Sequence, residues 1–163
     1  YEVPRIKQLN RSNKNLPEHG TDVIGFKFES SVDEPSRKDI LIAAEVKANL
    51  SGTNFNTIKK AVKDSKKDNF RIATTLDYYR LKLKQYGDVD NARKILRFER
   101  KSELPYKTIY NAFAITSLDV IDDNTIIQIN GSDLNLALNQ NVYFVHGKDL
   151  MELAHNVYDR CKE

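Results

Sequence analysis

Two carboxylates and one lysine are the residues whose types and spacing could carry out chemistry in this sequence. Asp22 begins one apolar, β-branched segment, and Glu45 and Lys47 lie inside a second, LIAAEVKANLSG at residues 41–52. Mg²⁺ is bound by one or two protein carboxylates together with water and substrate phosphate. A nearby ammonium group can orient a water molecule and stabilise charge that develops on phosphorus. These residue types together suit the hydrolysis of a phosphodiester bond.

The two segments that carry these residues are predicted to be neighbouring strands. Side chains alternate across a strand, so Glu45 and Lys47 share one face, and residues 40, 42, 44, 46 and 48 form a continuously apolar face. If strands 22–28 and 40–48 are antiparallel neighbours, the start of the first lies beside the end of the second. Asp22 and Glu45 then converge, with Lys47 beside them, at the kind of strand end where α/β folds usually place their chemistry.

The remaining pattern predicts an α/β domain with a mixed central sheet flanked by helices. From about Thr57 the apolar period changes from two to about 3.6, which indicates one long helix that ends near Gly87. Its stripe contains the polar residue Asn69, where we expect a kink. The other expected elements are a helix at 89–103, strands at 1–9, 110–120, 124–131 and 141–147, a turn at 122–124 and a C-terminal helix from about residue 150 to 161.

Length, charge and cysteine content bound the class of protein. The 163 residues, 40% of them hydrophobic and 30% charged, suit one folded domain. The net charge of +3 is too small to indicate nucleic-acid binding by itself. Cys161 is the only cysteine, which excludes an internal disulfide and, with only scattered histidines, argues against a zinc enzyme. No apolar run suffices for a membrane helix and no signal peptide begins the chain, so we expect a cytoplasmic protein without a membrane partner.

Basic residues gather in the helix that follows the segment with Glu45 and Lys47. Several of them share one helix face, opposite or beside the apolar stripe. This face could contact the phosphates of a nucleic acid, which position a duplex without reading its sequence. A solvated face, moderated by Asp64 and Asp68, explains the same pattern equally well. The candidate nucleic-acid-binding residues are Lys59, Lys60, Lys63, Lys66, Lys67 and Arg71.

The pair formed by Glu45 and Lys47 also has a purely structural interpretation. Taken alone, a carboxylate and a lysine on a half-exposed sheet are more simply explained as an ion pair, which contributes little to stability. The surrounding pattern changes this balance, because an acidic residue opens the preceding strand and a helix follows Lys47. The sequence has no G-x-x-x-x-G-K motif, which excludes ATP hydrolysis through a P-loop.

With that surrounding pattern, the chain resembles the PD-(D/E)XK nucleases. Three stretches, GTDVIGFKF, LIAAEVKANLSG and AVKDSKKDNFRIATTL, more narrowly resemble the nuclease subunit of the Hachiman anti-phage defence system, the HamA-like proteins. The resemblance is clear over residues 1–85 and looser beyond them. It implies a restriction-endonuclease-like core, with residues 1–163 forming a single nuclease domain. It also implies a DNA nuclease that acts as a defence effector beside a helicase partner.

The resemblance further implies a magnesium site. Asp22, Glu45 and the backbone carbonyl of Val46 are the expected ligands of Mg²⁺, for which Mn²⁺ is expected to substitute. Lys47 is expected to position the attacking water, and cleavage would leave a 5′-phosphate. Two alternatives stay open: a non-catalytic nuclease-like module that docks a helicase or DNA, and an RNA nuclease with the same core.

The related nucleases usually carry an acidic helix ahead of the first strand, and this sequence begins at Tyr1 without one. We therefore expect an upstream segment to be missing. Without such a helix an apolar face of the sheet would be exposed, which favours self-association or a partner chain. The 163-residue form is accordingly expected to be weakly active or inactive by itself.

Overall fold

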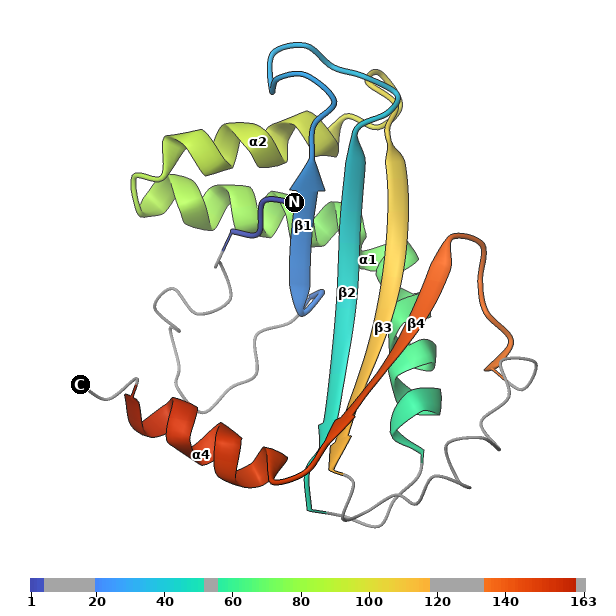
Figure 1. The fold of residues 1–163 in the computed structure, drawn as a ribbon. Helices are drawn as coiled ribbons and strands as arrows, with labels where there is room; N and C mark the ends of the chain where they lie inside the picture. The colour runs from blue at the N-terminus through green and yellow to red at the C-terminus, as the bar shows by residue number, and fades with distance from the viewer. Residues whose placement is uncertain (5–19, 52–55, 118–133, 161–163) are drawn as a thin grey trace.

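The computed structural model describes residues 1–4, 20–51, 56–117 and 134–160. Its centre is a four-stranded sheet with the strand order β1-β2-β3-β4 (Figure 1). β1 is antiparallel to β2, whereas β3 is parallel to both β2 and β4. This mixed sheet with its helices confirms the predicted α/β class. The elements are β1 (Val23–Lys27), β2 (Ile40–Asn49), α1 (Thr57–Gln85), α2 (Val89–Glu99), β3 (Lys107–Ser117), β4 (Gln140–Gly147) and α4 (Leu150–Arg160).

The antiparallel pairing of β1 with β2 confirms that the two predicted strands are neighbours. All five residues of β1 pair with β2, and the chain reverses through residues 28–39. Asp39 fixes the end of this connection. Its carboxylate accepts hydrogen bonds from the backbone N–H groups of Glu29 and Ser36, and it lies 2.7 Å from the guanidinium of Arg97 on α2. The hairpin register therefore does not depend on the turn residues alone.

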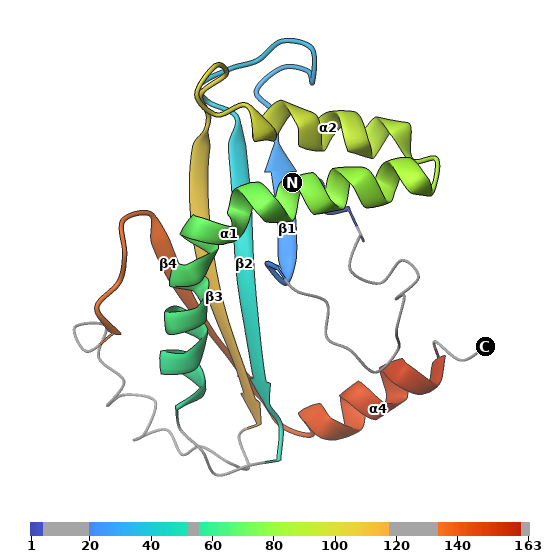
Figure 2. The same ribbon diagram turned by 180° about the vertical axis from the view of Figure 1, so that it is seen from behind.

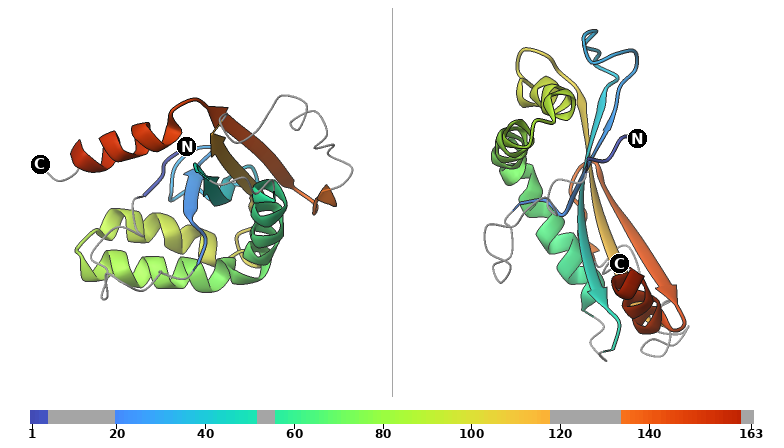
Figure 3. Two further views of the ribbon diagram at one scale, coloured as in Figure 1. Left: turned by 90° about the horizontal axis from the view of Figure 1, so that it is seen from below. Right: turned by 90° about the vertical axis from the view of Figure 1, so that its left-hand side faces the viewer.

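Helices α1 and α2 cover one face of the sheet. Figure 2 shows them side by side, and the edge-on view in Figure 3 places both on the same side of the strands. The predicted long helix is confirmed, and it bends between its two halves in Figure 2. Gly87, with a φ of +75°, allows the reversal into α2. Asp88 then caps α2, because its carboxylate accepts a hydrogen bond from the backbone N–H of Asn91.

The covered face of the sheet contains two hydrophobic clusters rather than one. The larger cluster joins β1 and β2 to the second half of α1 and to α2, and it includes Phe26 and Leu76. The smaller cluster joins the first turns of α1 to β3, and it includes Ile58. Between the parts of α1 that belong to these clusters lie Asp64 and Asp68. Polar side chains thus occupy the space where one apolar cluster gives way to the other.

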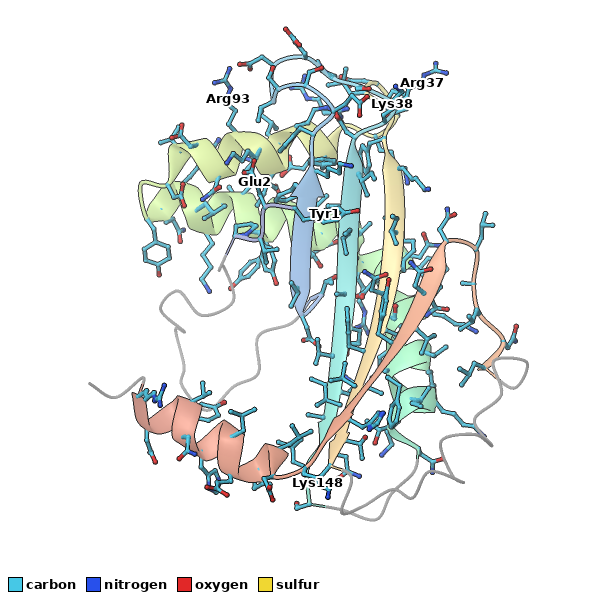
Figure 4. The ribbon with its side chains drawn as sticks, viewed as in Figure 1. Tyr1, Glu2, Arg37, Lys38, Arg93 and Lys148 are labelled. Atoms are coloured by element: carbon cyan, nitrogen blue, oxygen red, sulfur yellow. The ribbon has the colours of Figure 1, made fainter. Side chains whose placement is uncertain are left out.

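Several predicted boundaries are shifted. α2 ends at Glu99 rather than at residue 103, and β3 begins at Lys107 rather than at residue 110. Asn69 is exposed instead of belonging to the buried stripe of α1, and its Oδ1 accepts a hydrogen bond from the Tyr110 hydroxyl at 2.9 Å. The predicted strand at 124–131, the turn at 122–124 and most of the predicted strand at 1–9 lie outside the described residues. From that first segment, Glu2 forms an isolated bridge with β1 and is labelled beside it in Figure 4.

Helix α4 confirms the predicted C-terminal helix and extends away from α1 and α2 (Figure 1). None of its residues is buried, and its apolar side chains Leu153, Val157 and Tyr158 are exposed in the described structure. Across the described ranges, every helix is either too short or too polar to cross a membrane.

Candidate active site

The register of β1 and β2 brings Asp22 to Glu45. Val23 pairs with Ala44, so the residue before Val23 lies next to the residue after Ala44. The backbone N–H of Val46 donates a hydrogen bond to Asp22 Oδ2 at 3.0 Å. The structure therefore places the two predicted carboxylates together. They meet where β1 begins and near the end of β2, which runs to Asn49, one residue beyond the predicted end at residue 48.

Lys47 is held between two carboxylates. Its Nζ donates a hydrogen bond to Glu45 Oε1 and lies 3.2 Å from Oδ2 of Asp64 on α1. Partial burial lowers the pKa of Lys47, but the hydrogen bonds and charges of Glu45 and Asp64 outweigh burial and leave this pKa above its ordinary value. Lys47 is therefore protonated near neutral pH, and it can donate hydrogen bonds to an oxygen ligand rather than accept a proton.

Glu45 lies under α1 and is only 7% exposed. On this face of β2, Leu41 and Ala43 are buried as well, whereas Lys47, whose side chain is 33% exposed, and Asn49 are only partly buried. On the opposite, apolar face of β2, Ile42 and Val46 are only partly buried. The helix thus covers the face that carries the charges, so any ligand of Glu45 would be largely shielded from bulk water.

A fourth carboxylate, that of Asp68 on α1, lies close enough to Asp22 and Glu45 for their charges to act on it. Asp68 is 1% exposed, and its Oδ1 accepts a hydrogen bond from the Thr21 hydroxyl at 3.1 Å. Its Oδ2 has no hydrogen-bond partner among the described residues. Burial is the main cause that raises the pKa of Asp68 to about 6; Glu45 and Asp22 raise it further, and the bond from Thr21 acts against them. The site is therefore richer in carboxylates than the sequence indicated.

Asp64 and Asp68 are the site residues that sequence reasoning missed, because both were assigned to a solvated helix face. They are four residues apart and so share one face of α1, and this spacing in the helix directly after Glu45 and Lys47 was the available signal. The hydrogen bond from Lys67 is the main cause that lowers the pKa of Asp64; burial opposes it and the bond with Lys47 adds to it. The two aspartates thus have opposite pKa shifts, because Asp64 has lysine partners while Asp68 is buried beside like charges.

The oxygen atoms at this position fit a hard divalent cation such as Mg²⁺. In a strand the N–H and C=O groups of one residue point to the same side, so the Val46 carbonyl is directed to the same edge as its N–H, toward Asp22. The buried, unpaired Oδ2 of Asp68 leaves room for one more hydrogen-bond donor, such as a water molecule. Within the described ranges, no group of three or more His, Cys, Asp or Glu side chains is arranged to hold a metal ion. Mg²⁺ takes one or two protein carboxylates and keeps its other ligands from water and phosphate, and the carboxylates of Asp22 and Glu45 with the Val46 carbonyl are oxygen donors of that kind.

The six predicted nucleic-acid-binding residues do not share one free surface. Lys67 is bonded to Asp64, and Lys66 donates a hydrogen bond to the backbone carbonyl of Asn135. These two lysines are thereby directed to opposite flanks of α1. The remaining four are exposed, and they are Lys59, Lys60, Lys63 and Arg71.

Fold and site together define a mixed α/β domain in which an antiparallel strand pair and the helix after it gather carboxylates around a protonated lysine. The family model HamA matches residues 1–161 of this chain. The chain therefore belongs to the HamA family, the family of the Hachiman anti-phage defence protein. The match extends beyond residues 1–85, over which the sequence resemblance is clearest. No curated protein and no solved structure matches the chain.

Proposed function

We propose that this chain is a Mg²⁺-dependent nuclease that hydrolyses phosphodiester bonds in DNA, as the effector of an anti-phage defence system whose helicase is its partner. The observation that carries this proposal is the meeting of Asp22 and Glu45, distant in the chain, beside Lys47. Membership of the HamA family supports the defence role.

Each residue of the site has a distinct proposed part. Asp22, Glu45 and the Val46 carbonyl would hold the cation. When bound, Mg²⁺ polarises a phosphoryl oxygen and stabilises the leaving 3′-oxygen. Lys47, protonated and held by Glu45 and Asp64, would orient the attacking water and offset the charge that develops on phosphorus. Because its pKa is raised, Lys47 would act as a charged donor and not as the base.

Plasmid degradation by the protein together with its helicase partner tests the proposal. In Mg²⁺, Glu45→Gln and Lys47→Met should each lower the cleavage rate at least about 100-fold, the loss typical of removing one electrostatic group from an active site. The matched control is the exposed pair formed by Lys38 and Glu29, 3.1 Å apart in the connection between β1 and β2. Lys38→Met and Glu29→Gln should leave the rate unchanged.

Calorimetric titration with Mg²⁺ and thermal melts separate this function from its alternatives. Glu45→Gln should weaken cation binding, whereas Lys47→Met should retain it. If either variant folded and cleaved DNA at the normal rate, Glu45 and Lys47 would be a structural ion pair and not catalytic residues. Cation or DNA binding without cleavage by the natural protein would favour a docking module, and cleavage of RNA in place of DNA would favour an RNA nuclease.

A further inference from the structure

A hollow of about 570 Å³ lies beside α1, apart from the candidate active site. Its walls come from α1, the loop before β3, the start of β3, the segment 135–139, which precedes β4 in Figure 1, and Gln140 at the start of β4. Ser65, Lys66 and Phe70 of α1 line the hollow, whereas Asp64 and Asp68 do not. The volume falls within the range of sites for small ligands.

The charges around the hollow are all positive among the described residues. Lys66, Lys101 and Lys107 line it, and no Asp or Glu of the described chain does. Lys101 is held in place, because its Nζ donates a hydrogen bond to Thr108 Oγ1 at 2.9 Å and lies 5.2 Å from the centre of the Tyr106 ring. In a chain with 23 acidic residues, a lining without any of them favours an anionic ligand.

The hydroxyl of Ser65 gives a second, independent indication of a ligand. Ser65 lines the hollow and is 0% exposed, and its Oγ has no hydrogen-bond partner among the described residues. Buried hydroxyls are nearly always hydrogen-bonded, because leaving one unpaired is unfavourable. A ligand oxygen or nitrogen that entered the hollow would satisfy this group.

The hollow has a fixed wall and an apolar rim. The side-chain amide of Gln140 donates a hydrogen bond to the backbone carbonyl of Val62 at 3.0 Å, and its Oε1 accepts one from the N–H of Ala137 at 2.9 Å. Phe70 and Leu138 also line the hollow, yet they are 86% and 88% exposed. An exposed aromatic ring beside a positively charged groove is a typical stacking platform for a nucleic-acid base.

We propose that this hollow binds a nucleoside phosphate, supplied as one nucleotide of a single DNA strand. The phosphate contacts Lys66 and Lys107, the base stacks on Phe70, and the Ser65 hydroxyl bonds to a polar atom of the nucleotide. This inference rests on the proposed function only in taking DNA as the nucleic acid.

Helix α1 links the hollow to the candidate active site, which favours a strand over a free nucleotide. Residues four apart share a helix face, so Lys66 and Phe70 lie on one flank of α1 while Asp64 and Asp68 lie on the other. The exposed Lys63 lies between these flanks on the helix surface. A strand that crosses α1 over its basic residues reaches both places.

Binding is measured without cleavage, by fluorescence anisotropy of a short labelled oligo-dT in EDTA. Phe70→Ala should weaken binding about 5- to 150-fold, the contribution of one base stacked on an aromatic ring. Lys107→Gln should lower the slope of log affinity against log salt by about 0.7, the value for one phosphate contact on a single strand. Tyr158→Ala on α4 and Lys148→Gln after β4 are the matched controls, because both residues are exposed and lie outside the hollow. Lys148 is labelled in Figure 4.

The outcomes separate this inference from the proposed function. Ser65→Ala should leave the melting temperature unchanged and weaken oligonucleotide binding. If the variants of Ser65, Phe70 and Lys107 bound the oligonucleotide as well as the controls do, the inference would be wrong. If binding of a free deoxynucleotide required the hollow and binding of the oligonucleotide did not, the ligand would be a free nucleotide and not part of a DNA strand. Glu45→Gln should retain oligonucleotide binding. If oligonucleotide binding depended on the hollow but the natural protein never cleaved DNA, only the proposed function would be wrong.

Discussion

Replacing Asp68 by Asn should change how the stability of the protein depends on pH. The carboxyl group has a pKa of about 6 in the folded chain against an ordinary value of 3.8. Each unit of difference corresponds to about 1.4 kcal/mol, so the ionised side chain destabilises the fold by at most about 3 kcal/mol. The amide introduced by Asp68→Asn is neutral at every pH, and its oxygen could still accept the hydrogen bond that Thr21 donates.

The sign of the effect follows from which state holds the proton. Below about pH 4, Asp68 is protonated in the folded and the unfolded chain, and it carries no penalty. Between about pH 4 and pH 6 the unfolded carboxyl group has lost its proton while the folded one retains it, so the free energy of unfolding falls as the pH rises. Above about pH 6 both are ionised and the penalty is complete. The stability of Asp68→Asn relative to the natural protein should therefore rise from pH 4 to pH 8.

Urea unfolding followed by circular dichroism, at a series of pH values, measures this difference. The substitution by an amide could change the free energy of unfolding by an amount that does not depend on pH. That amount does not affect the result, because the experiment compares how the difference between variant and natural protein changes with pH. The control is Asp39→Asn, which removes a carboxylate whose partner Arg97 has a side chain only 2% exposed. That variant should lose about 3–5 kcal/mol at neutral pH, since it leaves a buried charge unpaired.

A difference between Asp68→Asn and the natural protein that stays constant from pH 4 to pH 8 would refute this reasoning. The same experiment in Mg²⁺ links Asp68 to the candidate site. A cation near Asp22 and Glu45 would offset the repulsion that Asp68 meets, so Mg²⁺ should stabilise the natural protein more than Asp68→Asn at pH 8.

Two other predictions concern the surface of α1 and the start of β1. Replacing Lys59, Lys60 and Lys63 together by Gln should weaken duplex binding equally for all sequences and lower the salt slope by about 0.9 for each phosphate that is no longer neutralised; an unchanged slope in anisotropy titrations would mean that these exposed lysines are merely solvated. Gly20→Ala should destabilise the fold more than Gly87→Ala in urea unfolding. Both glycines have positive φ, +108° and +75°, but only at Gly20 would the new Cβ meet a side chain, at 3.1 Å; equal destabilisation by the two substitutions would contradict this reasoning.

The meeting of Asp22 and Glu45 could be predicted from the sequence because it depends on local rules. Alternation along a strand fixes the shared face of Glu45 and Lys47, and a hairpin between consecutive strands fixes which ends meet. The start of α1 could likewise be predicted from local sequence, because the spacing of apolar residues changes from a period of two to one of about 3.6 at Thr57, where the helix begins. Each of these features can be deduced without knowing how the layers of the domain pack.

The contributions of α1 to the site could not be deduced in this way. Whether Asp64 and Asp68 face solvent or the sheet depends on how the helix lies over β2, and the pattern along the helix is equally compatible with a solvated face. Element ends show the same limit. α2 stops at Glu99 because the chain turns back to pack Tyr106 on Phe98, with ring centres 4.9 Å apart and the Tyr106 hydroxyl bonded to the Phe98 carbonyl at 2.6 Å.

The arrangement around Lys47 bears on whether the charged strand is structural or functional. A structural ion pair needs only one carboxylate for one lysine, and Glu45 already provides that carboxylate for Lys47. The fold nevertheless buries Asp68 nearby with one oxygen unpaired among the described residues and a pKa raised to about 6. Stability alone does not favour such a group, because removing its charge would strengthen the fold above about pH 6. Strongly shifted carboxyl groups near an ion pair are more typical of sites that bind or react, and this favours the catalytic interpretation of Asp22, Glu45 and Lys47.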